Sequence, residues 1–126
     1  MASRPSSSQG KTYPRAARLV RRGEFEVVYR GGKRLSAASF VVFARANGLG
    51  HSRFGISVKK ALGGAVVRNR VKRRVREILR LNFSEIPSGW DIVVHPRQLA
   101  LREPFANLAA ELLRLIAAAA KAKERA

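Results

Sequence analysis

Residues 53–80, RFGISVKKALGGAVVRNRVKRRVREILR, decide the fold and carry half of the formal charge of the chain. The stretch begins with an alternating segment typical of a β-strand, breaks at Gly63 and Gly64, and continues with helical periodicity over residues 65–83. At about 100° per residue, one side of this helix collects five aliphatic side chains: Val67, Val71, Val75, Ile78 and Leu79. We expect that side to face a hydrophobic core.

The rest of this helix is strongly cationic. Five polar side chains point away from the expected core: Asn69, Lys72, Arg73, Arg76 and Arg80. Three more arginines flank it: Arg68, Arg70 and Arg74. A solvated helix surface usually alternates its charges in i,i+4 pairs, but Glu77 is the one acidic residue in this segment. Because Arg matches phosphate oxygens bidentately and Lys supplies a point charge, the surface predicts phosphate binding.

Composition narrows the possible partners and compartments. The chain has 126 residues, the size of one domain, and 26 Lys and Arg against 8 Asp and Glu give it a formal charge of +18. This charge favours nucleic acid as the partner over a membrane surface. The absence of cysteine excludes disulfides, thiolate catalysis and Cys-based zinc sites. With no long apolar run and no signal-like start, the chain is expected to be cytoplasmic.

The pattern along the chain indicates an α/β (α+β) domain at residues 16–117. We expect a flexible basic arm at residues 1–15 and a helix end or tail at residues 118–126. A strand–helix–strand segment in the middle could connect parallel strands. The expected elements are a helix at 22–30, an antiparallel hairpin of strands 35–44 and 53–58, a central helix at 65–83, a strand at 90–94 and a helix at 103–121.

Aromatic residues suggest a second contact surface. Phe25 and Tyr29 lie one turn apart on the first helix, and Phe43 lies on a strand, so these rings are candidate stacking platforms for unpaired bases. For Phe25, packing in the core is an equally good interpretation. Three other aromatic residues are expected in the core: Phe40, Trp90 and Phe105.

The sequence predicts no catalytic residue and no metal ligand on this chain. The eight carboxylates are scattered among different elements, whereas a two-metal nuclease site needs several of them clustered. His51 and His95 are the only imidazoles, and neither has a Ser or Asp partner at a recognisable motif spacing.

The spacing Arg68-Asn69-Arg70-x-Lys72-Arg73-x-x-Arg76, within residues 53–80, resembles the signature of the bacterial ribonuclease P protein component. The similarity extends over about residues 15–116. It implies a small single domain with a mixed sheet of about four strands backed by helices, in the order helix-strand-strand-helix-strand-helix. It also implies a left-handed crossover, against the right-handed rule that holds in about 98% of cases.

The resemblance further implies an accessory subunit of an endoribonuclease. Its partners are then the catalytic RNA of ribonuclease P and the 5′ leader of precursor tRNA, with no membrane and no obligate protein partner. The RNA removes the leader by hydrolysis with Mg²⁺, which is bound mainly by the RNA. The positions implied to contact the catalytic RNA are Arg68, Asn69, Arg70, Lys72, Arg73 and Arg76, with Lys59 and Lys60. Those implied to line the leader-binding cleft are Phe25, Tyr29 and Phe43.

Two alternatives stay open on the sequence. A structural ribosomal or nucleoid-type protein has a similar charge and binds rRNA or duplex DNA without promoting leader cleavage. A protein-only nuclease cleaves without added RNA, although the scattered carboxylates argue against it.

Overall fold

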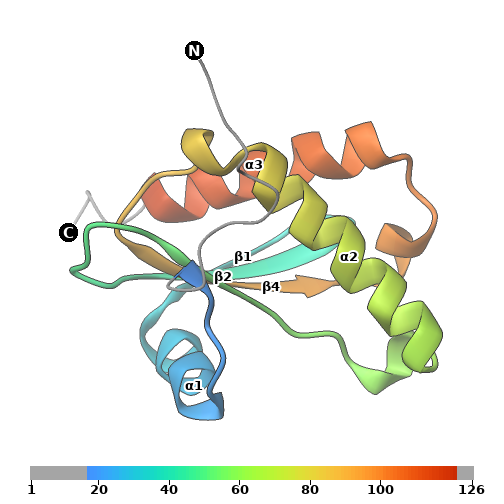
Figure 1. The fold of residues 1–126 in the computed structure, drawn as a ribbon, viewed down its shortest axis with the longest axis horizontal. Helices are drawn as coiled ribbons and strands as arrows, with labels where there is room; N and C mark the ends of the chain where they lie inside the picture. The colour runs from blue at the N-terminus through green and yellow to red at the C-terminus, as the bar shows by residue number, and fades with distance from the viewer. Residues whose placement is uncertain (1–16, 122–126) are drawn as a thin grey trace.

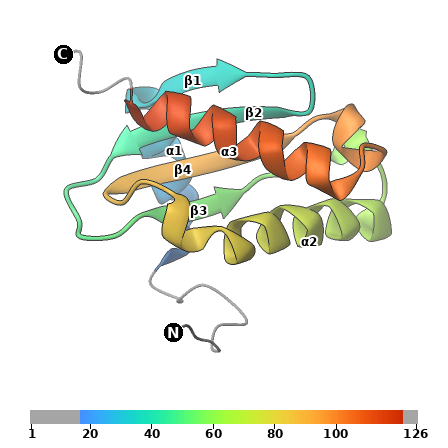
Figure 2. The same cartoon turned by 90° about the horizontal axis from the view of Figure 1, so that it is seen from above.

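The computed structural model describes residues 17–121, which form a four-stranded sheet with helices on both faces. Helices α2 and α3 cover one face and α1 covers the other (Figures 1 and 2). The elements are α1 (Arg22–Gly31), β1 (Lys33–Ser36), β2 (Phe40–Ala46), β3 (Arg53–Ile56), η2 (Lys60–Leu62), α2 (Ala65–Leu81), η3 (Phe83–Glu85), β4 (Trp90–Pro96), η4 (Gln98–Leu101) and α3 (Phe105–Lys121).

The sheet has the strand order β1-β2-β4-β3, which corrects the expected hairpin. Residues 35–44 are not one strand, because a turn at residues 37–39 divides them between β1 and β2, which pair antiparallel. Strand β3 pairs with β4 and not with β2, so the predicted hairpin of residues 35–44 and 53–58 is wrong. The physical reason is burial: β4 is buried on both faces, and its central position separates β2 from β3.

The expected mixed sheet and the crossover between parallel strands are confirmed. Strands β3 and β4 run parallel, whereas β1–β2 and β2–β4 run antiparallel. In Figure 2 the chain runs to the right along β3, returns to the left through α2 and runs to the right again along β4. Since α2 passes on the side of the sheet that faces the viewer, and β4 lies above β3 in that view, the crossover is left-handed.

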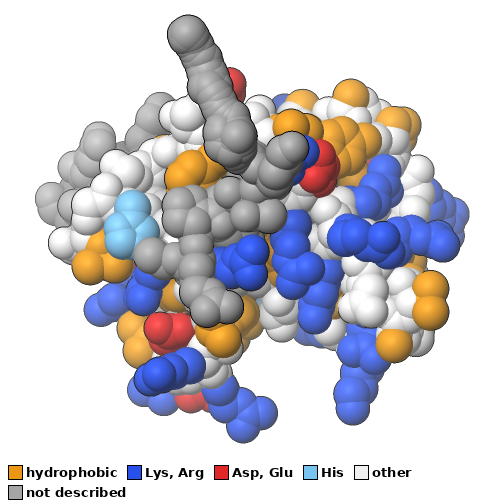
Figure 3. All heavy atoms as spheres, viewed as in Figure 1, with side chains coloured by type: hydrophobic (Ala, Val, Ile, Leu, Met, Phe, Trp, Pro, Cys, Tyr) orange, Lys and Arg blue, Asp and Glu red, His pale blue; other side chains and the backbone are white. Residues whose placement is uncertain are grey.

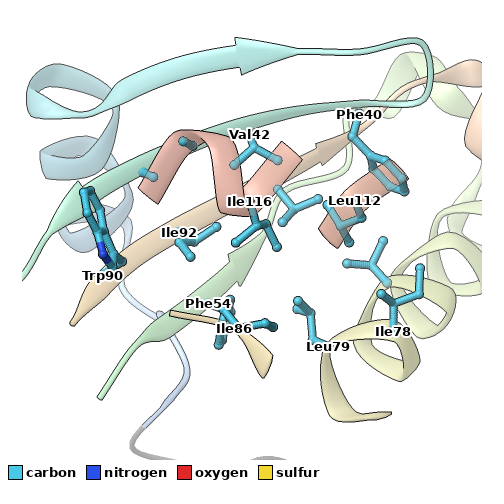
Figure 4. Packing of buried hydrophobic residues seen from close by; sticks show 14 of the residues in the cluster. Phe40, Val42, Phe54, Ile78, Leu79, Ile86, Trp90, Ile92, Leu112 and Ile116 are labelled. Atoms are coloured by element: carbon cyan, nitrogen blue, oxygen red, sulfur yellow. The ribbon is translucent and has the colours of Figure 1, made fainter. Parts of the chain in front are cut away.

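The main core lies between the sheet and the helix pair α2 and α3. Four of the five aliphatic residues expected to face it are buried, namely Val71, Val75, Ile78 and Leu79, and Val67 at the start of α2 is half-buried. Phe40 and Trp90 are buried as expected, and Phe105 is half-buried against the same cluster. Figure 4 shows Ile78 and Leu79 of α2, Ile92 of the sheet, and Leu112 and Ile116 of α3 in the same cluster. Burial of one such side chain is worth roughly 1.5–3 kcal/mol.

A smaller apolar cluster joins α1 to the opposite face. Its buried members are Leu19, Val28 and Val93. Helix α1 packs closely on the sheet at Gly55, where an added Cβ would lie 2.5 Å from Cζ of Phe25. Glycine at this position therefore lets the phenyl ring lie directly against β3.

The predicted basic arm at residues 1–15, and residues 122–126 of the predicted tail, lie outside the described residues. Residues 118–121 form the last turn of α3. Within residues 17–121, none of the helices is both long enough and apolar enough to span a bilayer.

Candidate nucleic-acid interface

One face of α2 presents the predicted phosphate-binding surface. We call it the α2 ridge, and its members are Asn69, Arg70, Lys72, Arg73 and Arg76. All are exposed except Lys72, which is half-buried. Figure 3 shows Lys and Arg side chains gathered over α2. In the part of the chain that the structure describes, no ion pair involves a ridge cation, so these charges are available to an external anion.

The arginines beside the ridge have partners within the protein. Arg68 Nε donates to the carbonyl of Gly63 at 3.1 Å. Arg74 donates to the carbonyls of Ala100 and Glu103 at 3.0 and 2.8 Å, which ties α2 to the segment before α3. Arg74 therefore has a structural role, and Arg68 has one donor engaged at the start of its own helix.

Arg80, predicted to bind RNA, lies one turn beyond the ridge and pairs with Glu77. Its Nε donates to Glu77 Oε1 at 3.1 Å, and its Nη2 also contacts this carboxylate. Hydrogen bonding to the Arg80 guanidinium stabilises the ionised form of Glu77 and so lowers the pKa of that carboxyl. Because the pair cancels one positive charge, Arg80 contributes less to the cationic surface than the ridge residues do.

The predicted aromatic platforms lie together on the α1 face of the sheet. The Tyr29 and Phe43 ring centroids are 4.9 Å apart in an edge-to-face arrangement, and those of Phe25 and Tyr29 are 6.5 Å apart. All three residues are half-buried, so each packs against the sheet and still exposes part of its surface. We call this group the aromatic cleft. It can hold an unpaired base, because every base has a π-face.

His95 extends the aromatic cleft, and the sequence did not place it there. Its Nε2 is 2.7 Å from the hydroxyl of Tyr29, and its ring centroid lies 5.4 Å from those of both Tyr29 and Phe43. The available signal was alternation along β4, where His95 lies two residues after Val93 and so shares its face.

Burial sets the protonation states in the cleft. Burial lowers the pKa of His95, and Lys59 and Arg34 lower it further. Burial also raises the pKa of Tyr29, against a smaller opposing effect of a hydrogen bond with Ser57. At neutral pH we therefore assign a protonated phenol that donates to Nε2 of a neutral imidazole.

A cavity of about 410 Å³ opens beside this ring cluster. Phe43 and His95 form its aromatic wall, and the cations Arg34, Lys59 and Arg97 line it. Arg34 Cζ lies 6.0 Å from the centroid of the Phe43 ring. Lys59 therefore lies at this cavity, beside the aromatic cleft. Lys60 does not line it and is exposed at the start of η2.

An ionic network holds the first turn of α1 against the sheet. Asp91, only 3% exposed, accepts hydrogen bonds from Arg53 Nε at 2.8 Å and Nη2 at 2.6 Å, and from Asn47 at 2.9 Å. Arg53 also contacts Glu24 of α1 at 3.4 Å. The sequence showed no sign of this network, since its members come from separate elements.

Both carboxylates of the network are held in the ionised form. Burial alone would raise the pKa of Asp91, but the hydrogen bonds from Arg53 and Asn47 outweigh it and the pKa lies below its usual value. Glu24 Oε1 accepts the backbone N–H groups of Arg21 and Val20, which lowers the pKa of Glu24. Both carboxylates are thus satisfied internally, and in the described part of the chain no group of three His, Asp or Glu could hold a metal ion.

The fold and these two surfaces define an RNA-binding α+β protein. The family whose sequence model is described as Ribonuclease P matches residues 13–120. The ribonuclease P protein component of Thermotoga maritima is 47% identical over 95 residues, which are 75% of this chain and 80% of that protein.

Solved structures show the same fold. The ribonuclease P protein from Thermotoga maritima superposes with a TM-score of 0.74 at 44% identity, covering 79% of this chain and 94% of that one. The corresponding protein from Staphylococcus aureus has a TM-score of 0.74 at 34% identity, covering 83% and 96%. The chain belongs to the ribonuclease P protein family, the protein component of a tRNA-processing ribonucleoprotein that works with an RNA subunit.

Proposed function

We propose that the α2 ridge binds the catalytic RNA of ribonuclease P, while the aromatic cleft binds the single-stranded 5′ leader of precursor tRNA. The observation that supports this division is that the two surfaces lie on different faces of one sheet. The apolar side of α2 is buried, so the ridge is rigidly presented. The cleft offers partly exposed rings, which suit unpaired bases rather than a duplex.

In this proposal the protein changes binding and leaves bond chemistry to the RNA. Ridge cations neutralise phosphates where the catalytic RNA and its substrate meet, which increases substrate affinity and lowers the Mg²⁺ concentration that the complex needs. The neighbouring carboxylates Glu24 and Asp91 are engaged by Arg53, so they do not fit a Mg²⁺ site. In this proposal Mg²⁺ is therefore bound by the RNA. The assembled particle is assigned to the cytoplasm, because a chain without cysteine suits a reducing compartment.

Reconstitution tests the proposal. The full chain is added to a bacterial ribonuclease P RNA and a precursor tRNA at a Mg²⁺ concentration too low for the RNA alone. We expect 5′ leader release only when both the chain and the RNA are present. Leader release by the chain without RNA, or tight RNA binding with no gain in cleavage, would contradict the proposal, and the latter result would favour a structural ribosomal or nucleoid-type role.

Tyr29→Ala is expected to reduce the preference for precursor over mature tRNA by roughly tenfold, because stacking on one aromatic ring is worth about 1–3 kcal/mol per base. The measurement compares the affinity of the assembled particle for precursor and mature tRNA. Tyr29→Phe keeps the ring and is expected to retain most of the preference. An equal loss for both substrates would instead place Tyr29 in general packing.

A further inference from the structure

The cavity beside His95 combines two features that the α2 ridge lacks. One is an aromatic wall formed by Phe43 and His95, and the other is a set of three cations from separate elements: Arg34 of β1, Lys59 after β3 and Arg97 after β4. Its volume of about 410 Å³ lies within the range of ligand sites. Arg97 Nη1 donates to the carbonyl of Ala37 at 3.1 Å, which fixes this side chain at the rim.

His95 is the group in this cavity that can titrate near neutral pH. The charged and titratable groups that face it are Tyr29 from α1, Arg34 from β1 and Lys59 from the segment after β3. Strand β2 contributes Phe43, which has no charge. The cation Arg97 follows two residues later on its own chain segment. Without a bound anion the imidazole therefore faces cations, and none of the residues that line the cavity is a carboxylate.

We propose that this cavity binds one nucleotide of the leader, with its base against Phe43 and its phosphate among Arg34, Lys59 and Arg97, and that His95 takes up a proton when the phosphate arrives. The inference rests on the proposed function of the aromatic cleft and adds the phosphate contacts and a proton linkage. A nucleotide within a single strand is the ligand class that fits, since it joins a phosphate anion to a stacking base.

The sign of the linkage follows from electrostatics. In the empty cavity, burial and the neighbouring cations Lys59 and Arg34 hold the pKa of His95 below its usual value. A bound phosphate offsets part of this repulsion with its negative charge and so raises that pKa. Binding therefore becomes tighter as the pH falls, because the complex holds one more proton than the free protein.

The proton has a defined place in the structure. It comes from solvent and binds to Nε2 of His95, the atom that accepts from Tyr29 in the neutral state. The Tyr29 hydroxyl then rotates, accepts the new N–H and turns its own proton toward another acceptor, such as the Ser57 hydroxyl with which it already interacts. An N–H bond forms at Nε2, and no bond between two heavy atoms forms or breaks.

The test measures the affinity of the full chain for a labelled oligouridylate between about pH 5 and pH 8, the range in which histidine titrates. Uracil and phosphodiesters do not titrate there, so the pH dependence reports on the protein. We expect the affinity to rise about three- to tenfold toward low pH, equivalent to a change of about half to one unit in the pKa of His95.

Three variants make the experiment decisive. His95→Gln cannot titrate and is expected to bind with the high-pH affinity of the wild type at every pH. The matched control His51→Gln removes the imidazole at a different cavity, beyond the other end of β2, and is expected to keep the full pH dependence. Lys59→Ala is expected to weaken binding at every pH.

The outcomes separate this inference from the proposed function. Wild-type binding that does not change with pH, or a pH dependence that persists in His95→Gln, would overturn the proton linkage and leave leader binding intact. Absence of oligouridylate binding at every pH would overturn the proposed leader site itself. Loss of the pH dependence in His95→Gln alone would support the inference.

Discussion

Asp91→Ala is expected to lower the free energy of unfolding by about 2–3 kcal/mol, because it leaves Arg53 without its main partner inside the structure. The estimate is at the low end for a broken buried pair, since the Arg53 side chain is 25% exposed and keeps its contact with Glu24. Asn47 also loses an acceptor. Urea denaturation of the full chain at neutral pH measures the change.

The same carboxylate gives the stability a defined pH dependence. A folded-state pKa below the unfolded value of about 3.9 means that Asp91 contributes stability above that pH and that the contribution is lost as the pH falls through the folded-state pKa. The wild type is therefore expected to lose more stability than Asp91→Asn when it is acidified from about pH 5 to about pH 3.

Glu85→Ala is the control, because it removes an exposed carboxylate outside the network. We expect its unfolding free energy to stay within about 0.5 kcal/mol of the wild type. If Asp91→Ala were equally mild, the ionic network would not be a major source of stability for the α1 face.

The double variant Arg73→Ala and Arg76→Ala is expected to bind the catalytic RNA about 20-fold more weakly at about 0.15 M salt, because it removes two phosphate contacts. If about six cations meet phosphates, the wild-type slope of log affinity against log salt is roughly −4 to −5, and the variant should reduce its magnitude by about 2. Filter binding over a series of salt concentrations gives both quantities.

A matched variant distinguishes the effect of the ridge cations on RNA affinity from the effect of the total charge. Arg102→Ala and Arg114→Ala remove the same charge from exposed positions at or near α3. We expect this pair to change RNA affinity by less than about threefold, because salt screens charges that lie away from the bound RNA. Equal weakening by both pairs would mean that the RNA responds to total charge rather than to the ridge.

Local periodicity predicted the helices and the central strand well. The aliphatic stripe of α2 follows a 3.6-residue period, so its buried and cationic sides could be assigned from the sequence. The run over residues 90–94 is apolar at consecutive positions after Asp91, which is typical of a strand buried on both faces. The ridge was therefore predictable, because one element alone defines it.

Pairing between distant strands was not predictable in the same way. The sequence KRLS of β1 is short and mostly exposed, so it carries no strong strand pattern. The polar segment at residues 47–50 looks like a hairpin turn, but the strand that β3 pairs with is β4 and not β2. The resemblance to a known family, rather than periodicity, supplied the four-stranded sheet and the left-handed crossover.

The contacts of His95 and Asp91 were not predicted for the same reason. His95 meets Tyr29 only because β4 and α1 pack together, and Asp91 meets Arg53 only through the parallel register. In both pairs the partners lie far apart along the chain, at separations of 66 and 38 residues. No spacing rule could therefore find them before the topology was known.

The parallel pairing of β3 with β4 has a consequence for biosynthesis. Emerging from the ribosome, α1, β1 and β2 come first, but the strand that lies between β2 and β3 is translated only after α2. The proposed leader site therefore forms last, when Trp90–Pro96 inserts, whereas α2 needs only local contacts to form its helix. A nascent chain could thus attract polyanions before it can recognise a substrate.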